Sequence, residues 1–279
     1  MSIASRHAPA PTSLLSAGGS AVKHRQLIAT MARRDVVGRY RGSVFGIAWS
    51  LLNPILMLLV YTFVFGVIFR ARWGVTQSES RAEFALVLFV GLIVHGMIAE
   101  CLNRAPGLIA QHSNYVKKLV FPLEILPIVV LVSAVFHSLI STGVLVIALL
   151  LAKGTLPAAS ITLPAIVGPL LLMTLGLTWA VSSLGVFVRD LTQTMGIVTA
   201  VLLFLSPVFY PLSAVPAEFR TLIQLNPLTF YIEQARGVLI WGVWPDWLML
   251  LLHSLVAVAV AWIGYWWFQR TRKGFPDVL

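Results

Sequence analysis

A long uncharged run near the amino terminus most constrains how this chain can fold. Residues 42–69 contain no Asp, Glu, Lys or Arg, and the basic residues Arg33, Arg34, Arg39 and Arg41 stand directly before them. A helix needs about 20 apolar residues to cross the hydrocarbon core of a bilayer, so this run can span a membrane with tilt. Because Lys and Arg beside a span are retained inside, the arginines predict a cytoplasmic flank.

Five further segments with few charged residues repeat this pattern. The predicted spans lie at about 44–69, 84–103, 125–152, 160–188, 191–210 and 247–269. With 58% hydrophobic and 11% charged residues, the 279-residue chain has the composition of a polytopic membrane protein. We therefore predict an all-α fold with six transmembrane helices in one membrane domain, residues 21–279.

The distribution of basic residues predicts the topology. Six spans place both termini on one side, together with the segment 104–124 and the turn at Arg189. These parts carry 14 of the 20 Lys and Arg residues, and the loops on the other side carry six. The bias predicts that both termini are cytoplasmic. It also accounts for the net charge of +10, so we expect anionic lipid as a partner and no nucleic acid.

The residues before the first span divide into two parts. Residues 1–20 are rich in Ala, Ser, Pro and Gly, which predicts a disordered cytoplasmic tail. Within 22–41, the apolar residues Leu27, Ile28 and Met31 fall on one side of a helix. This pattern predicts an amino-terminal interfacial helix on the inner leaflet, and a solvated basic linker is the alternative.

The longest predicted cytoplasmic connection is the loop 104–124. Prolines bound its middle part, where we predict a short helix over 107–118 with Asn103 as a cap. The polar and aromatic residues of this loop are Arg104, His112, Tyr115, Lys117 and Lys118. Two interpretations remain open: a basic interhelical loop, or a docking element for a cytoplasmic partner.

A second irregular region follows the fifth predicted span. Five prolines interrupt an apolar stretch between residues 207 and 245, so it does not form a simple seventh span. Asn226 followed by Pro227 is typical of a helix cap with a first-turn proline. We predict two short re-entrant or interfacial helices within 211–240, because irregular backbone at membrane depth needs protein or water beside it.

Motifs for catalysis and nucleotide binding are absent from the sequence. It contains no GxxxxGK[ST], and none of its five lysines follows a glycine, so the chain cannot form a Walker A loop by itself. It also lacks GxSxG, HExxH and CxxC, and its single cysteine, Cys101, excludes an intrachain disulfide. We therefore predict a chain that is not an enzyme and holds neither a metal nor a cofactor.

One acidic residue, Glu100, falls within a predicted span. A carboxylate in the centre of a bilayer costs about 2.5–3.5 kcal/mol on insertion scales. Glu100 lies near the cytoplasmic end, so we expect its side chain to reach the interface by snorkelling. His95 is five residues away, about 140° around a helix, and is not expected to pair with it.

Aromatic residues gather near the predicted membrane interfaces. Trp49 begins the first span, and Trp262 and Trp266 share one face of the last. Interface belts explain such positions. The alternative is a channel lined with flat aromatic faces, over which sugar rings can slide, with Trp49, Trp262 and Trp266 as its candidate residues.

Several ordered segments resemble a known family. They are residues 33–69, the loop from Asn103 to Pro122, SSLGVFVRDL at 182–191, LSPVFYP at 205–211 and LNPLTFYIEQAR at 225–236. Together they resemble the permease subunits of ABC exporters of bacterial surface polysaccharides, of the O-antigen and teichoic-acid type. The resemblance implies an inner-membrane protein in which two copies form one pathway for a polyprenyl-diphosphate-linked glycan. Two separate cytoplasmic ABC ATPase subunits would bind ATP and Mg and dock on the loop 104–124.

The resemblance also implies roles for individual residues. The helix 22–41 would be a gate whose arginines Arg33, Arg34, Arg39 and Arg41 meet the phosphates of the carrier lipid. The helices of 211–240 would form an outer gate that includes Tyr210, Pro211, Glu233 and Arg236. Two alternatives remain: a permease for a drug or small lipid, and a membrane enzyme of glycan assembly.

Overall fold

The computed structural model describes residues 12–69, 73, 81–116 and 121–279, and every regular element in these ranges is helical. Five of its segments are long and apolar enough to cross a membrane. They are Gly46–Ile68, Glu83–Gln111, Ile125–Lys153, Ala158–Phe187 and Trp247–Val278. These segments agree with five of the six predicted spans.

The fifth predicted span is shorter than expected. Helix α8 covers Leu191–Leu205, only 15 residues, and does not reach residue 210. At 1.5 Å per residue it is about 22 Å long, which is less than the roughly 30 Å hydrocarbon thickness. Ser206 is extended, with φ −96° and ψ 150°, because the proline that follows disfavours a helical conformation at this position.

The amino-terminal segment is more ordered than predicted. Helix α1 begins at Leu14 and ends at Lys23, so the predicted disorder is wrong for the part of 1–20 that this helix covers; residues 1–11 lie outside the described residues. Ser13 caps α1 and Ala17 is buried in the core, which explains why the helix forms. The predicted interfacial helix becomes α2, Arg25–Arg39, separated from α1 by a break at His24.

The predicted cytoplasmic loop is mostly helical. Helix α4 runs without a break over Arg81–Gln111, so the prediction that Asn103 caps a new helix is wrong, and residues 107–111 of the predicted helix 107–118 form the end of α4. A Cβ on Gly185 would overlap with the carbonyl oxygen of Pro106, so this glycine allows α7 (Leu163–Phe187) to pack closely over the proline turn. Only α5, Ser113–Val116, is separate. Lys117 and Lys118 lie outside the described residues.

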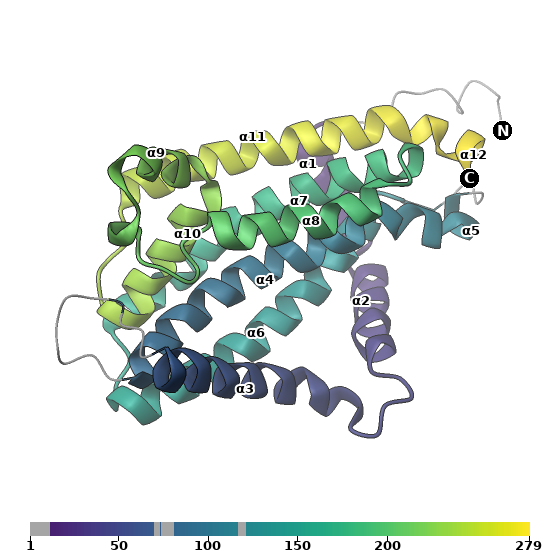
Figure 1. The fold of residues 1–279 in the computed structure, drawn as a ribbon. Helices are drawn as coiled ribbons and strands as arrows, with labels where there is room; N and C mark the ends of the chain where they lie inside the picture. The colour runs from purple at the N-terminus through teal and green to yellow at the C-terminus, as the bar shows by residue number, and fades with distance from the viewer. Residues whose placement is uncertain (1–11, 70–72, 74–80, 117–120) are drawn as a thin grey trace.

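Helix α4 is the centre of the helical bundle (Figure 1). Helices α6 (Ile125–Lys153), α7 and α8 pack around it. In the most apolar 18-residue stretch of this span, 72% of the residues are buried. The corresponding value is 6% for the first span, which comprises a short 3-10 helix (Gly46–Ala48), α3 (Trp49–Tyr61) and a π-helical continuation, Thr62–Ile68. Helix α3 is therefore a peripheral helix.

The two ends of the bundle differ. Helices α2, α5 and α12 (Phe275–Val278) lie at one end in Figure 1, here called the basic end. Helices α9 (Ala217–Leu225) and α10 (Pro227–Arg236) lie at the opposite end and are the two short helices predicted within 211–240. The predicted cap of α10 is confirmed, since Asn226 Oδ1 accepts the Leu228 N–H at 3.1 Å.

A buried arginine fixes α10 to the rest of the bundle. The Arg236 guanidinium is fully buried and donates to the carbonyl oxygens of Val87 at 2.9 Å, Pro207 at 2.5 Å and Val208 at 2.9 Å. It also pairs with Glu233 at 3.0 Å. Burial lowers the pKa of Arg236 to about 10, despite the opposing effect of Glu233, so the side chain stays charged at neutral pH. One side chain thus holds α10 to α4 and to the segment after α8.

The last span crosses α7 at two glycines. A Cβ on Gly264 in α11 (Trp247–Thr271) would overlap with the Gly176 carbonyl oxygen, and a Cβ on Gly176 would lie 2.5 Å from the Ala261 Cα atom. Small residues let transmembrane helices approach closely and gain dispersion contacts over their full length. This glycine contact therefore sets the separation of α7 and α11.

The glycine contact predicts a selective loss of stability. Gly264→Ala should lower the melting temperature of the purified protein, because a methyl group here forces the helices apart at a cost of about 1–3 kcal/mol. The control is Gly168→Ala in α7, where no atom lies within 4 Å of the added Cβ. Equal melting temperatures for the two variants in the same detergent would contradict the glycine contact.

The role of Arg236 can be tested by a change that keeps its charge. Arg236→Lys should destabilise the protein by about 2–5 kcal/mol, because an ammonium group cannot reach three carbonyls in different directions and leaves buried acceptors unpaired. Arg220→Lys is the matched control, since Arg220 of α9 is partly exposed and donates to Val215 O, five residues earlier, at 3.1 Å. If both variants unfold at the same denaturant concentration, Arg236 does not hold α10.

Candidate functional site

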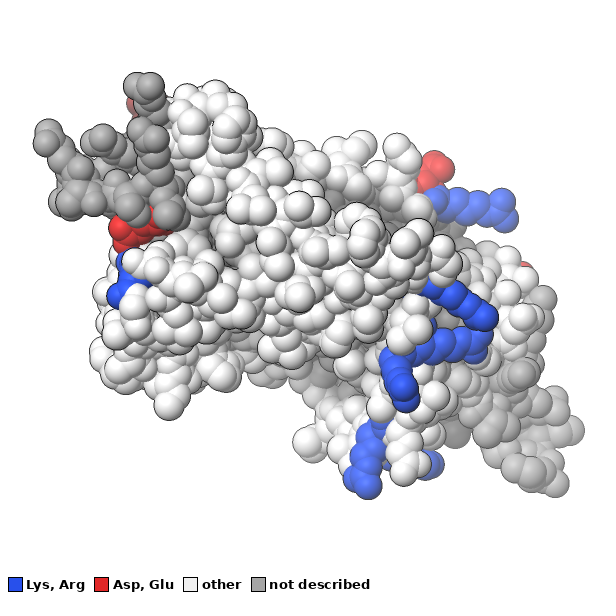
Figure 2. Space-filling view, turned by 90° about the horizontal axis from the view of Figure 1, so that it is seen from below, with Lys and Arg blue, Asp and Glu red and all other residues white. Residues whose placement is uncertain are grey.

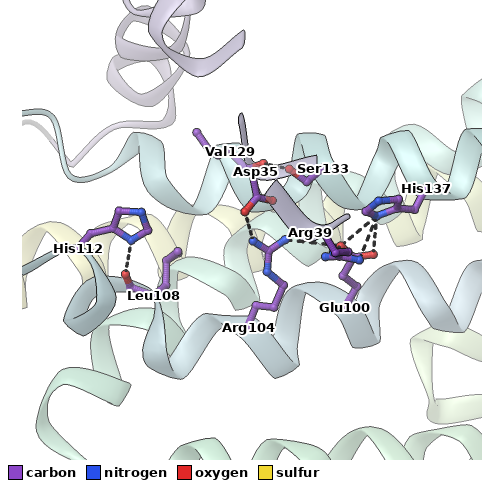
Figure 3. A network of polar contacts seen from close by, with 9 residues as sticks. All are labelled: Asp35, Arg39, Glu100, Arg104, Leu108, His112, Val129, Ser133 and His137. Atoms are coloured by element: carbon purple, nitrogen blue, oxygen red, sulfur yellow. Dashed lines mark hydrogen bonds and ion pairs between the residues drawn. The ribbon is translucent and has the colours of Figure 1, made fainter. Parts of the chain in front are cut away.

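A network of ion pairs joins α2 to α4 at the basic end (Figure 3). Arg39 Nη2 donates to Glu100 Oε1 at 2.5 Å, and Arg104 Nη2 donates to Asp35 Oδ1 at 2.6 Å. Asp35 and Arg39 lie one turn apart on α2, and Glu100 and Arg104 lie one turn apart on α4. Each helix thus carries one acidic and one basic residue, and the two helices form two ion pairs with each other.

Glu100 is the centre of this network. Besides Arg39 it contacts His137 Nδ1 of α6 at 3.1 Å and Arg104 Nη1 at 3.5 Å. Its side chain is 17% exposed. The prediction that Glu100 reaches the interface by snorkelling is therefore wrong: the carboxylate stays largely inside and is stabilised by cationic and imidazole partners. Sequence spacing gave no sign of this, because Arg39 and His137 belong to other helices.

The second carboxylate, Asp35, lies at the contact of α2 with α4 and α6. Burial of Asp35 favours its neutral form, but interactions with Arg104, Ser133 and Arg39 outweigh burial and lower the pKa of Asp35 below its ordinary value of 3.8. The Asp35 carboxylate is therefore ionised at neutral pH and holds Arg104 in place.

A cleft of about 870 Å³ opens beside the network, between α2, the last turns of α4, α5 and α6. Three of its lining side chains are cationic, namely Arg34, Arg39 and Arg104. Further hydrogen-bonding groups come from Asp35, Asn103, Gln111, His112, Asn114, Tyr115 and Thr192. Apolar residues of α6, such as Val129 and Val130, complete the wall. Such a lining suits a ligand with an anionic head and an apolar neighbour.

The four predicted headgroup arginines do not form one cluster. Arg34 and Arg39 line the cleft, whereas Arg33 is exposed on α2 and is not among the lining residues. Arg41 is exposed in the turn after α2. Arg104 joins them instead, because α4 continues past residue 103 and carries this side chain toward α2.

The predicted docking residues lie at the same end. His112 Nδ1 is 2.8 Å from the Leu108 carbonyl oxygen, and the His112 ring stacks on Tyr115 with centroids 5.8 Å apart. Tyr115 stacks on Phe121 at 4.3 Å. These contacts fix α5 against the end of α4, so α5 and the cleft share residues.

The three candidate channel tryptophans are not brought together within one chain. Trp49 is 36% exposed at the start of α3, where its ring contacts Phe45. Trp262 and Trp266 are 51% and 39% exposed on α11, which lies across the bundle from α3 in Figure 1. All three therefore lie on the surface of the chain.

The predicted outer-gate residues lie at the opposite end from the cleft. Glu233 and Arg236 form the ion pair described above, and Tyr210 OH donates to the Phe204 carbonyl oxygen at 2.9 Å. Pro211 begins the short turn Leu212–Ala214. The buried position of Arg236 makes it an anchor of α10, and a gating role of this group stays a prediction.

Charged side chains mark the ends of the molecule. Figure 2 shows Lys and Arg gathered toward one end and a broad face without charged residues beside them. The exposed face of α8 contributes apolar residues such as Ile197, Val201 and Phe204. This arrangement is that of a protein with an apolar belt and a basic interface on one side.

The lowered pKa of Asp35 predicts a pH dependence. Its ion pair stabilises the fold fully above pH 3.8 and loses this effect as the pH falls through the lowered pKa of Asp35. Asp35→Asn should therefore melt below the wild type at pH 7, and the difference should shrink when the pH falls below about 3.8. A difference in melting temperature that stays constant or grows at low pH would contradict the assigned ion pair.

Comparisons with known proteins agree with this architecture. Residues 26–240 match the family described as ABC-2 type transporter. The O-antigen export system permease protein RfbA of Myxococcus xanthus is 27% identical over 258 residues, covering 91% of this chain and 96% of the relative. A Klebsiella pneumoniae protein of the same name is 25% identical over 91% of this chain and 95% of the relative. The polysialic acid transport protein KpsM of Escherichia coli is 22% identical over 86% and 91%. The resemblance drawn from the sequence is thus confirmed, and the chain belongs to the ABC-2 type transporter family.

Proposed function

We propose that this chain is the permease subunit of an ATP-driven exporter that moves a lipid-linked, O-antigen-like polysaccharide across the bacterial inner membrane. The main support is the cationic cleft between α2 and α4, since a polyprenyl diphosphate combines two phosphates with a long apolar chain. Relatives that are named as O-antigen permeases and cover 91% of this chain support the same class of substrate.

The headgroup would bind at the basic end. Arg34 and Arg39 of α2 and Arg104 of α4 all line the cleft, and guanidinium groups bind phosphate through paired, charge-assisted hydrogen bonds. This proposal keeps two of the four arginines predicted from the sequence as ligands and leaves Arg33 and Arg41 at the lipid surface. Anionic lipids are the natural partners of these two exposed side chains.

The energy source would be a separate protein. Two cytoplasmic ABC ATPase subunits would bind ATP and Mg and dock near α5, where Arg104, His112, Tyr115, Lys117 and Lys118 are candidate contacts. The cleft includes His112, Asn114 and Tyr115, so a force on α5 acts directly on the wall of the headgroup site. The basic end is then cytoplasmic, with both termini on that side.

A second copy of the chain would complete the pathway. Large apolar residues of the first span and of α8, such as Leu59, Phe63, Ile197 and Phe204, are more than half exposed. Gly196 and Ala200 give α8 a flat strip on the same face, of the kind that allows close helix contact. In the dimer, α3 and α8 would border the conduit, and Trp49, Trp262 and Trp266 stay candidates for its aromatic surface.

The proposal predicts different effects for two neighbouring arginines. In a reconstituted complex with its ATPase, Arg34→Gln should raise the concentration of polyprenyl-diphosphate-linked glycan that half-saturates ATPase stimulation by about fivefold or more, as expected for about 1 kcal/mol of lost binding. Arg33→Gln removes the same charge from the same helix outside the cleft, and should have a much smaller effect.

Two results would contradict the proposal. Equal effects of the two substitutions would show that the cleft does not bind the headgroup. Stimulation by drugs or short lipids but not by the glycan would instead support the drug-permease alternative, and glycan turnover without ATP would support an enzyme.

A further inference from the structure

The cations of the cleft are already engaged by the protein itself. Arg39 is paired with Glu100 at 2.5 Å, and Arg104 is paired with Asp35 at 2.6 Å. Arg34 forms no ion pair within the described residues. A dianionic headgroup that enters the cleft therefore meets one available guanidinium and two that are bound to carboxylates.

These ion pairs also hold one half of α2. The amino-terminal half packs through Ile28 and Ala32 against Ile125 and Val129 of α6, in an apolar cluster. In the carboxy-terminal half, Val36 is buried and Asp35 and Arg39 form the ion pairs, whereas the outer residue Val37 is 49% exposed. Loss of the ion pairs would leave the second half with fewer contacts to the bundle, while the apolar cluster retains the first.

We propose that Glu100 and Asp35 occupy the places of the ligand's phosphates, so that a diphosphate headgroup binds by taking Arg39 and Arg104 from them and releases the end of α2. Carboxylate and phosphate both accept paired hydrogen bonds from guanidinium, and they compete for the same donors. This inference rests on the proposed function, because it assumes that the cleft is the headgroup site.

The surroundings of the two carboxylates make the exchange feasible. Glu100 keeps His137 at 3.1 Å on α6, so it is not left without a partner when Arg39 turns away. Asp35 moves with α2 toward water. Arg104 Nη1 is buried, lies 3.5 Å from Glu100 Oε1 and has no hydrogen-bond partner among the described residues, so a phosphate oxygen can add a hydrogen bond to it. A ligand can shift an equilibrium only through such a difference in affinity between two states.

The test uses the full complex in nanodiscs and farnesyl diphosphate as a probe that carries no sugar. Glu100→Gln and Asp35→Asn should each bind the probe about fivefold more tightly than the wild type, because a neutral amide competes poorly for arginine. Glu83→Gln is the matched control, since Glu83 lies on the same helix and pairs with Lys153 at 2.5 Å at the other end. Its affinity should equal that of the wild type.

A spin label at Val37→Cys supplies a second readout. The label should become more mobile when the probe binds to the wild type, and it should already be mobile in Glu100→Gln without the probe. Cys101 is fully buried and is not expected to react with the label. Farnesol, which lacks phosphate, and inorganic diphosphate, which lacks the lipid, separate the contributions of the two parts of the probe.

The outcomes distinguish the two levels of the proposal. If the wild type does not bind the probe, or if Arg34→Gln does not weaken binding, the headgroup site itself fails. If Arg34→Gln weakens binding but neither Glu100→Gln nor Asp35→Asn strengthens it, the site holds and the competition is overturned. Each carboxylate variant is first checked for a monodisperse, folded complex. If one of the two variants misfolds, the other still tests the competition.

Discussion

The organisation of this protein depends on one constraint: a charge inside an apolar helical bundle must be paired. Helix α4 is the most buried span, yet it carries Glu83, Glu100 and Arg104. Each is paired with a charged residue of another helix, namely Lys153 of α6 for the first and Arg39 and Asp35 of α2 for the other two. Because leaving a buried charge unpaired is costly, these pairs hold α2 and α6 beside α4.

The same constraint acts in different ways at the two ends. At the end with α9 and α10, the guanidinium of Arg236 is held by backbone carbonyls and by Glu233, with an exposed fraction of 0%. At the basic end, Arg39 is 37% exposed beside a cleft, and its partner is a side chain. A backbone carbonyl is fixed in position by its helix or loop, so it cannot release the arginine that it binds. A side-chain partner can rotate away, and water or a ligand can take its place. One arginine therefore stabilises the fold, and the other is suited to meet a ligand.

Much of the fold could be predicted from hydropathy, because length and lack of charge define a transmembrane helix. The cap at Asn226 and Pro227 was predictable as well, since it is a local interaction. The continuation of α4 through Pro106 was not, because a close contact with Gly185 of another helix stabilises it. For the same reason the sequence identified basic residues near the first span but not their partners: Glu100 and His137 meet Arg39 only through tertiary packing. In the sequence, Arg104 is one of the basic residues that indicate a cytoplasmic segment; in the structure its side chain lines the cleft.

We propose that the cleft between α2 and α4 receives the anionic headgroup of a lipid-linked glycan. The most direct measurement is a cryo-EM structure of the complex with its ATPase and a polyprenyl-diphosphate-linked sugar. We expect density for the diphosphate beside Arg34, with Arg39 and Arg104 turned toward it and away from Glu100 and Asp35. Diphosphate density elsewhere in the membrane domain, with the cleft empty and both ion pairs intact, would contradict it.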